Sequence, residues 1–364
     1  MLSTIFTVSL AQSALELGCI YALVALALFV SYGLLNIADL STDGCFTLGC
    51  AVGATVTLAG HPYLALLAAA GAGATSGLVT ALLQTRFGIE SILAGIVVNT
   101  GLYTINIMVM GFSSQLNLFG CDTVFTLAEE VITNDWCDFI VAAVVVAIVG
   151  VILTWFLGTR LGLSIRATGD NEAMVRASSI NPAFTITVGL ILSNSLTGLA
   201  GGLLAQYQRS CDINIGTGQV TIALASLVIG QTLFGKNGRM GKRVVGVVAG
   251  SCLYRFIVAI ALRFDVPAES LKLISAIIVA LAIALPYLRD QLRFQKTKRN
   301  AMKKRASLAA AGAGDTGAAT VDGAVGDVAA NATVADGDAA SGDAGAEAGS
   351  DDPDPGSPAS ERGR

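Results

Sequence analysis

The sequence predicts an all-α, polytopic membrane protein with about eight to nine transmembrane segments, some of them broken or re-entrant. Hydrophobic residues make up 54% of the 364 positions. Charged residues make up 13%, whereas an ordinary soluble domain carries about 25%. The apolar residues also gather in long runs, and a run of about 20 residues is enough to cross a bilayer as a helix. A polytopic helical fold accounts for both observations.

The apolar segments can be placed in order along the chain. They lie at about 5–32, 44–60, 63–84, 91–111, 138–157, 183–205, 218–235, 244–262 and 271–288. The second and the seventh are short, so either is a candidate for a broken or re-entrant helix. The first Lys or Arg is Arg86, so the first segment lacks the basic flank of a cleavable signal peptide and is expected to be retained. We predict one transmembrane domain over residues 1–290.

The basic residues predict the orientation of this domain. Lys and Arg gather in cytoplasmic loops, and here they fall in alternate connections, at Arg86, 159–182, 236–243 and 289–305. The acidic stretch 112–136 falls on the opposite side. We therefore expect a multi-pass protein of the plasma membrane, with the N-terminus outside and the C-terminus in the cytoplasm.

Two further segments follow the transmembrane domain. The basic segment 291–305 is expected to lie against anionic lipid headgroups. Residues 306–364 are rich in Ala, Gly and Asp, and they contain eleven acids and two arginines. They cannot bury a core and are predicted to form a disordered, acidic cytoplasmic tail. The net charge of −4 comes from this tail, because the rest of the chain carries fifteen acids and twenty Lys and Arg.

The stretch 159–182 is a long polar and basic insert between two apolar segments. We expect Gly169 to end an extended arm, and Asp170 or Asn171 to cap a short helix that reaches Ser179. Its 24 residues exceed what a plain connection needs. We interpret the helix as a docking site for a partner in the cytoplasm, with a simple connecting loop as the alternative.

A second polar stretch, 36–44, precedes the second apolar segment and contains no basic residue. If that segment is a broken helix, the stretch turns inside the membrane and lines a water-filled path, where irregular backbone is tolerated. A plain cytoplasmic turn is the alternative. Asn99, an amide in the fourth segment, would line the same path or bond a neighbouring helix. The candidate path residues are Asn36, Asp39, Asp43, Gly44 and Asn99.

Two charges and several glycine pairs lie inside the apolar segments. Charged groups in a membrane are costly and usually paired, so Glu16 and Arg255 are predicted to form an intramembrane ion pair. The alternative is that either faces an aqueous cavity.

Glycines four residues apart let helices approach closely. They are expected to pack the bundle, with one pair at a homodimer seam as the alternative. The pairs are Gly49/Gly53, Gly73/Gly77, Gly198/Gly202 and Gly246/Gly250. Asn106, Asn194 and Gln206 are further amides in apolar segments. Each is expected to bond a neighbouring helix, with a place on the path as the alternative.

The sequence contains no pattern typical of a catalytic or metal site. His61 is the single histidine, beside Pro62 at an outer turn. Residues 230–237 match most of a phosphate-binding loop, but Asn237 replaces the required Ser or Thr and the stretch ends an apolar segment. The cysteines lack metal-site spacing and are expected to act as small apolar residues. A disulfide among Cys121, Cys137 and Cys211 is the alternative. We expect no catalytic residue, metal or cofactor in this chain.

Three stretches carry a specific resemblance to known proteins. They are 16–23 (ELGCIYAL), 36–49 (NIADLSTDGCFTLG) and 160–174 (RLGLSIRATGDNEAM), with weaker likeness at 225–230 and 253–255. Over about residues 10–290 the chain resembles the membrane permease subunits of ATP-binding-cassette (ABC) importers of the branched-chain amino acid and ribose type. Within that group it looks closest to an uncharacterised subset proposed to carry tryptophan or tyrosine.

The resemblance implies a permease that dimerises, forms the path for a small solute such as an amino acid, and does not itself hydrolyse ATP. ATP would be bound and hydrolysed by a separate ABC ATPase subunit, and an extracytoplasmic substrate-binding protein would deliver the solute. The stretch 159–182 then resembles the coupling helix that the ATPase holds. The coupling residues implied are Arg166, Gly169, Asp170, Asn171, Glu172, Met174 and Arg176.

Two other functions remain as alternatives at the level of sequence. An ion-gradient-driven secondary transporter would need inverted repeats and paired acids at the membrane midplane, and the sequence contains neither clearly. A membrane scaffold without transport activity is the other. Lipid is an expected partner and nucleic acid is not.

Overall fold

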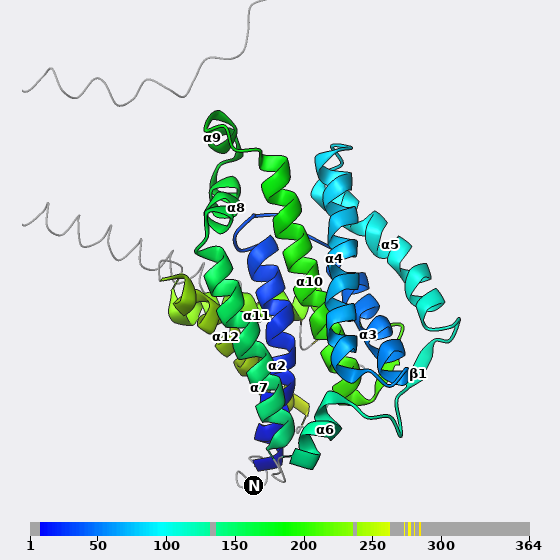
Figure 1. Cartoon of the computed structure of the whole chain (residues 1–364). Coiled ribbons are helices and arrows are strands. Elements are labelled where there is room, and N and C mark those ends of the chain that lie inside the picture. The colour runs from blue at the N-terminus through cyan, green and yellow to red at the C-terminus, as the bar shows by residue number, and fades with distance from the viewer. Residues whose placement is uncertain are drawn as a thin grey trace, which may run out of the picture. The chain divides into compact units, whose positions relative to one another are not determined.

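The computed structural model describes residues 8–131, 136–235 and 239–262, and five separate positions between 273 and 284. Within these ranges the predicted all-α membrane fold is present, as a bundle of long helices with a single two-stranded sheet (Figure 1). Six helices contain stretches long and apolar enough to cross a membrane. They are α2 (Val8–Ser31), α4 (Pro62–Thr85), α5 (Ser91–Val109), α7 (Cys137–Leu157), α10 (Pro182–Gln208) and α12 (Met240–Leu262).

Two shorter helices stand where broken helices are predicted. Helix α3 (Thr42–Leu58) has 17 residues and α11 (Gln219–Phe234) has 16. At 1.5 Å per residue, each falls short of the ~30 Å hydrocarbon layer. Irregular backbone at 32–41 precedes α3, and strand β2 (Ser210–Asp212) with a turn precedes α11. Six of the nine predicted segments are thus helices long enough to span the membrane and two are shorter helices, and the ninth falls almost wholly outside the described residues.

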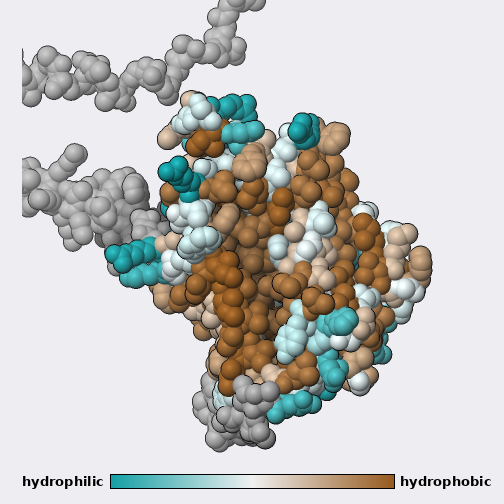
Figure 2. Space-filling model, in the orientation of Figure 1, coloured by the Kyte–Doolittle hydropathy of each residue, from teal (hydrophilic) through white to brown (hydrophobic). Residues whose placement is uncertain are grey.

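The connections separate into two ends of the bundle. Helices α8 (Arg160–Asp170) and α9 (Glu172–Ala177) lie at one end, and β1 (Gln115–Asn117) and α6 (Val124–Val131) lie at the other (Figure 1). Strand β1 pairs antiparallel with β2. Figure 2 shows a broad hydrophobic surface between hydrophilic groups at the two ends. This distribution is the one a membrane-embedded bundle requires.

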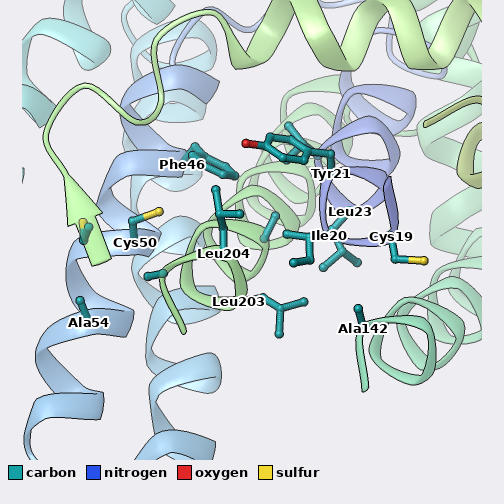
Figure 3. Close-up of a cluster of buried hydrophobic side chains, with 14 of the residues drawn as sticks. Cys19, Ile20, Tyr21, Leu23, Phe46, Cys50, Ala54, Ala142, Leu203 and Leu204 are labelled. Atoms are coloured by element: carbon teal, nitrogen blue, oxygen red, sulfur yellow. The ribbon is translucent and has the colours of Figure 1, made fainter. Parts of the chain in front are cut away.

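Helix α2 forms the centre of the bundle. From Ile20 to Val30 no residue exposes more than 7% of its surface, because the helix is apolar on every side and neighbouring helices cover it. Its residues pack with Phe46 of α3 and with Leu203 and Leu204 of α10 (Figure 3). The core is therefore built around the first segment of the chain.

Glycines bring α3, α4 and α10 into backbone contact. A Cβ atom on Gly53 would lie 2.7 Å from the Cα of Gly202, and one on Gly49 would overlap the backbone of Gly198. In lipid, such close approach replaces the hydrophobic drive that packs soluble helices. All four predicted glycine pairs make contacts of this kind within one chain, which supports bundle packing over a homodimer seam.

All seven cysteines are free thiols, and five of them are buried. The alternative of a disulfide among the three outer cysteines is therefore not realised in this structure. The predicted basic segment 291–305 and the tail 306–364 lie outside the described residues.

Candidate functional site

The two short helices begin at the same place in the structure. Asp43, in the first turn of α3, accepts hydrogen bonds from the backbone N–H of Gly218 (3.0 Å) and of Val220 (2.9 Å). These amides belong to the start of α11, where a helix leaves N–H groups without an internal partner. A carboxylate is also favoured there by the helix dipole. One side chain therefore joins the starts of two helices that do not cross the membrane completely.

The backbones of the two helix starts also touch. Gly216 packs against the carbonyl oxygen of Asp43, so a Cβ atom at position 216 would overlap that oxygen and the hydroxyl of Thr47. Gly218 has a φ of +86°, a conformation that other residues rarely adopt. Both glycines are required by this geometry. We call this contact between Asp43 and residues 216–220 the helix junction.

A cavity of about 420 Å³ lies beside the helix junction. This volume suits a small solute, since ligand sites usually measure about 300–1,000 Å³. Its wall is formed by α3, α5 and the turn after β2, and most of its side chains are polar. The wall residues are Asp43, Gly44, Thr47, Asn99, Thr100, Tyr103, Thr104, Asn106, Ile213, Asn214, Gly216 and Thr217. The cavity is open on one side, where Thr100, Tyr103, Thr104, Asn214 and Thr217 are exposed. A polar cavity bordered by apolar helices is what a path for a hydrophilic solute requires.

Three of the predicted path residues meet in this wall, namely Asp43, Gly44 and Asn99. Helix α5 lies so close to α3 that a Cβ atom on Gly44 would be 2.6 Å from the Asn99 Oδ1. The Asn106 Nδ2 donates a hydrogen bond of 3.1 Å to the Gly44 carbonyl oxygen. The cavity thus borders the start of α3, as expected for a broken second segment.

The structure places the other two predicted path residues elsewhere. Asp39 is buried, with 4% exposure. Its Oδ1 accepts from the N–H and hydroxyl of Ser41, and its Oδ2 accepts from the Asn194 Nδ2 at 2.7 Å. Asn36 is exposed, in a left-handed conformation (φ +56°). Because protein donors occupy Asp39, it joins the 32–41 segment to α10 and does not line the cavity.

The predicted ion pair between Glu16 and Arg255 is not formed by these two described side chains. The Glu16 carboxylate accepts from the Gln12 Nε2 (3.0 Å) and the Tyr207 hydroxyl (2.7 Å). The Arg255 guanidinium lies over the ring of Tyr21, 3.5 Å from its centroid. Neutral donors satisfy the acid and a cation–π contact offsets the desolvation of the base, so neither charge needs the other.

The stretch 159–182 differs from the prediction in its first half. Residues 160–170 form helix α8 and not an extended arm. The Thr159 side chain accepts from the N–H of Gly162 and caps the helix. One face of α8 is buried through Gly162, Ile165 and Thr168. These residues are three apart, so the helical face was present in the sequence, although glycines in the stretch are weak helix formers.

Helix α8 also touches the segment that leads to α3. Gly169 packs so closely on the Leu34 carbonyl oxygen that a Cβ atom would overlap it. Asn171 then adopts an extended conformation (φ −160°) that ends α8, and its side chain accepts from the N–H of Met174 (3.0 Å) to cap α9. Asn171 is thereby confirmed as a helix cap. The 159–182 stretch is in direct contact with the irregular backbone before the helix junction.

Helix α9 presents a mixed polar and apolar face. Val175 is 2% exposed and anchors the helix, while Met174 is 65% exposed. Glu172 and Arg176 form an exposed i,i+4 ion pair of 2.8 Å. A short helix with one buried anchor and an exposed face is suited to contact with another protein.

A family model for the permease component of branched-chain amino acid transport systems matches residues 10–285. The chain belongs to this permease family. It is similar to the tyrosine transport system permease protein of Clostridioides difficile (strain R20291), with 33% identity over 79% of this chain and 94% of that protein. It is also similar to the ribose import permease protein of Escherichia coli (strain K12), with 28% identity over 67% of this chain and 75% of that protein. No solved structure matches.

These comparisons confirm the resemblance seen in the sequence. The protein is a multi-pass membrane permease of the ABC transporter class, and its role is transport across a membrane. The turn before the seventh apolar segment was not predicted to border the path, although Asn214, Gly216 and Thr217 line the cavity. The signal available was the pair of glycines directly before the short seventh segment, because glycines mark a close backbone approach.

Proposed function

We propose that this permease is the membrane-spanning subunit of an ABC importer, and that the cavity beside the helix junction is part of the solute's path. The observation that carries the proposal is the meeting of α3 and α11 at Asp43 beside a polar cavity. Discontinuous helices that meet in this way are how membrane transporters place polar groups at depth in the bilayer.

A continuous set of contacts supports coupling between the cytoplasmic end and the cavity. Gly169 of α8 lies on Leu34, at the start of the irregular segment 32–41. That segment is held to α10 through Asp39 and ends at the first turn of α3, which contains Asp43. A displacement of α8 and α9 by a partner would therefore reach the helix junction through a few residues.

The partners follow from the family and from the exposed face of α9. An ABC ATPase subunit binds α8 and α9 in the cytoplasm and hydrolyses ATP. The ATPase-facing residues are those of the predicted coupling set other than Gly169, which packs on Leu34, and Met174, Glu172 and Arg176 lie on the exposed face of α9. A substrate-binding protein delivers the solute at the β1 end. Two copies of the chain form the complete membrane unit, with the C-terminus of each in the cytoplasm.

We further propose an amino acid as the solute, because the tyrosine transport system permease matches over most of both chains. A sugar is the second candidate, supported by the ribose import permease. The alternative of an ion-driven transporter is less well supported: the two buried acids Glu16 and Asp39 both bond protein donors, and a proton or ion relay needs acids that are available.

The test is uptake by proteoliposomes that contain the full chain and the ATPase that co-purifies with it. The double variant Arg166→Glu, Arg176→Glu is expected to lose ATPase association and to reduce ATP-dependent uptake to background, because both side chains belong to the proposed docking surface. Membrane insertion should be unchanged. Arg86→Glu is the matched control, since Arg86 is an exposed arginine in the connection between α4 and α5. Normal uptake by the double variant would refute the coupling assignment.

A further inference from the structure

One polar atom in the cavity wall lacks a hydrogen-bond partner. Asn106 of α5 is 1% exposed, and its Oδ1 has no partner among the described residues. Its Nδ2 donates to the Gly44 carbonyl oxygen. This bond fixes which way the amide points, because the reverse orientation would set two oxygens against each other. A buried acceptor without a donor is costly, so Asn106 is poised for a donor that the protein does not supply.

The rest of the wall also favours a donor over an anion. None of the described wall residues is Lys, Arg or His. The one charged side chain, Asp43, is negative, and both of its oxygens are held by N–H groups of α11. Most of the other wall residues are neutral Thr, Asn and Tyr side chains. The described wall therefore offers neutral polar groups and a negative charge, and no cation for a carboxylate or phosphate.

We propose that Asn106 is a specificity-determining residue, whose Oδ1 accepts a hydrogen bond from an ammonium or hydroxyl group of the solute in this cavity. The inference rests on the proposed function, since it takes the cavity as part of the solute's path. A zwitterionic or uncharged solute enters with its donor-bearing end toward Asn106. A solute whose only polar groups are carboxylates or phosphates leaves the acceptor unpaired and meets the charge of Asp43.

The experiment measures protection of an engineered thiol in the full chain in lipid nanodiscs. Thr104→Cys places the thiol on an exposed residue of the cavity wall, and its reaction with a maleimide is followed by mass spectrometry of the corresponding peptide. Two matched pairs of probes are compared at equal concentration. Phenethylamine and 3-phenylpropionate share a ring but carry an ammonium or a carboxylate as their only polar group. 2-Phenylethanol and phenyl phosphate carry a hydroxyl group or a phosphate.

We expect phenethylamine, 2-phenylethanol or both to slow the labelling about threefold or more, and the two anionic probes to leave it unchanged. Protection by phenethylamine alone identifies an ammonium as the donor, and protection by 2-phenylethanol alone identifies a hydroxyl group. Equal protection by an anionic probe, or no protection by any of the four, overturns the inference.

Two variants test the role of Asn106 itself. Asn106→Leu removes the acceptor and should abolish protection. Asn106→Asp keeps an acceptor and adds charge, so protection by phenethylamine should be retained or increased. A merely structural role for Asn106 predicts loss of protection in both variants, and a Leu variant that is protected like the parent also overturns the inference. Donor-selective protection without ATPase association would instead contradict the proposed importer function, so the two failures are distinguishable.

Discussion

Asp39 and Asp43 lie four residues apart in the same polar stretch, yet the structure gives them different surroundings. Asp39 is buried and bonds side chains of its own segment and of α10. Asp43 borders the cavity and bonds only backbone N–H groups at the start of α11. We infer that a carboxylate bonded to buried side chains contributes strongly to the stability of the fold. A carboxylate bonded to the N–H groups at a helix start contributes less, so its bonds can be broken at a modest cost in free energy. We assign the first to stability and the second to the path.

The largest expected effect is that of Asp39→Ala. The change leaves the Asn194 Nδ2 and the Ser41 N–H buried without an acceptor, so the loss of stability should be about 3 kcal/mol or more. Gel filtration and thermal unfolding of the purified protein measure it. Asn36→Ala, at an exposed position of the same segment, is the control and should behave like the parent. An Asp39→Ala protein that unfolds at the parent's temperature would remove the distinction between the two acids.

Exchanging the two side chains of the Asp39–Asn194 pair tests whether they interact directly. Asn194→Asp alone sets two carboxylates against each other at the position of a 2.7 Å hydrogen bond and should destabilise strongly. Adding Asp39→Asn restores a carboxylate–amide pair. We expect the double variant to recover about 1–2 kcal/mol relative to Asn194→Asp, a coupling typical of residues in direct contact. Additive losses in thermal unfolding would show that the two side chains do not interact.

A smaller loss of stability is expected for Asp43→Ala. Removing a helix-capping carboxylate costs about 1–2 kcal/mol, so the protein should fold and insert. ATP-dependent uptake should nevertheless fall to background, because the junction beside the path is opened. Asp43→Ser, which keeps a capping oxygen, should retain part of the uptake. Full uptake by the Ala variant would place Asp43 outside the path.

The smallest effect is expected for an exposed acid, Glu172→Gln. Its ion pair with Arg176 is exposed at the surface of α9, and such pairs contribute about 0.3–0.5 kcal/mol. Thermal unfolding should therefore barely change. This variant gives the smallest loss of stability against which the Asp39 and Asp43 variants are compared. A loss of more than about 1 kcal/mol in the free energy of unfolding would mean that the ion pair, and not Val175 alone, holds α9 in place.

The positions of the helices were predictable because they depend on local composition. Apolar runs of about 20 residues mark α4, α5, α7 and α10 to within a few residues. Helix α8 was missed because Gly162 and Gly169 weaken a helical pattern, although the same glycines allow its close packing. The family was predictable from stretches such as 160–174.

The roles of single polar residues were predictable only in part. Asp43, Gly44 and Asn99 were expected to meet, and they line one cavity. Asp39 has a local partner in Ser41, but the partners that separate it from Asp43 in role lie 155 and 175 residues away. The Glu16–Arg255 pair failed for a related reason: the donors that satisfy Glu16 include Tyr207, which only the fold brings near.

The glycine contacts between α3, α4 and α10 have a consequence for motion. Where backbone lies on backbone, no side-chain rotamers are frozen by packing and none are available to adjust. Such an interface resists gradual deformation and behaves as a stiff frame. Movement of α3 is then expected to occur by bending at its start, near residues 41–43, where hydrogen bonds of Asp39 and Asp43 hold the chain in place of contacts between glycines of packed helices. Amide hydrogen exchange should be slow along the glycine contacts and faster at the start of α3. The packed parts of α3, α4 and α10 would then be the rigid side of a hinge whose moving side begins near residues 41–43.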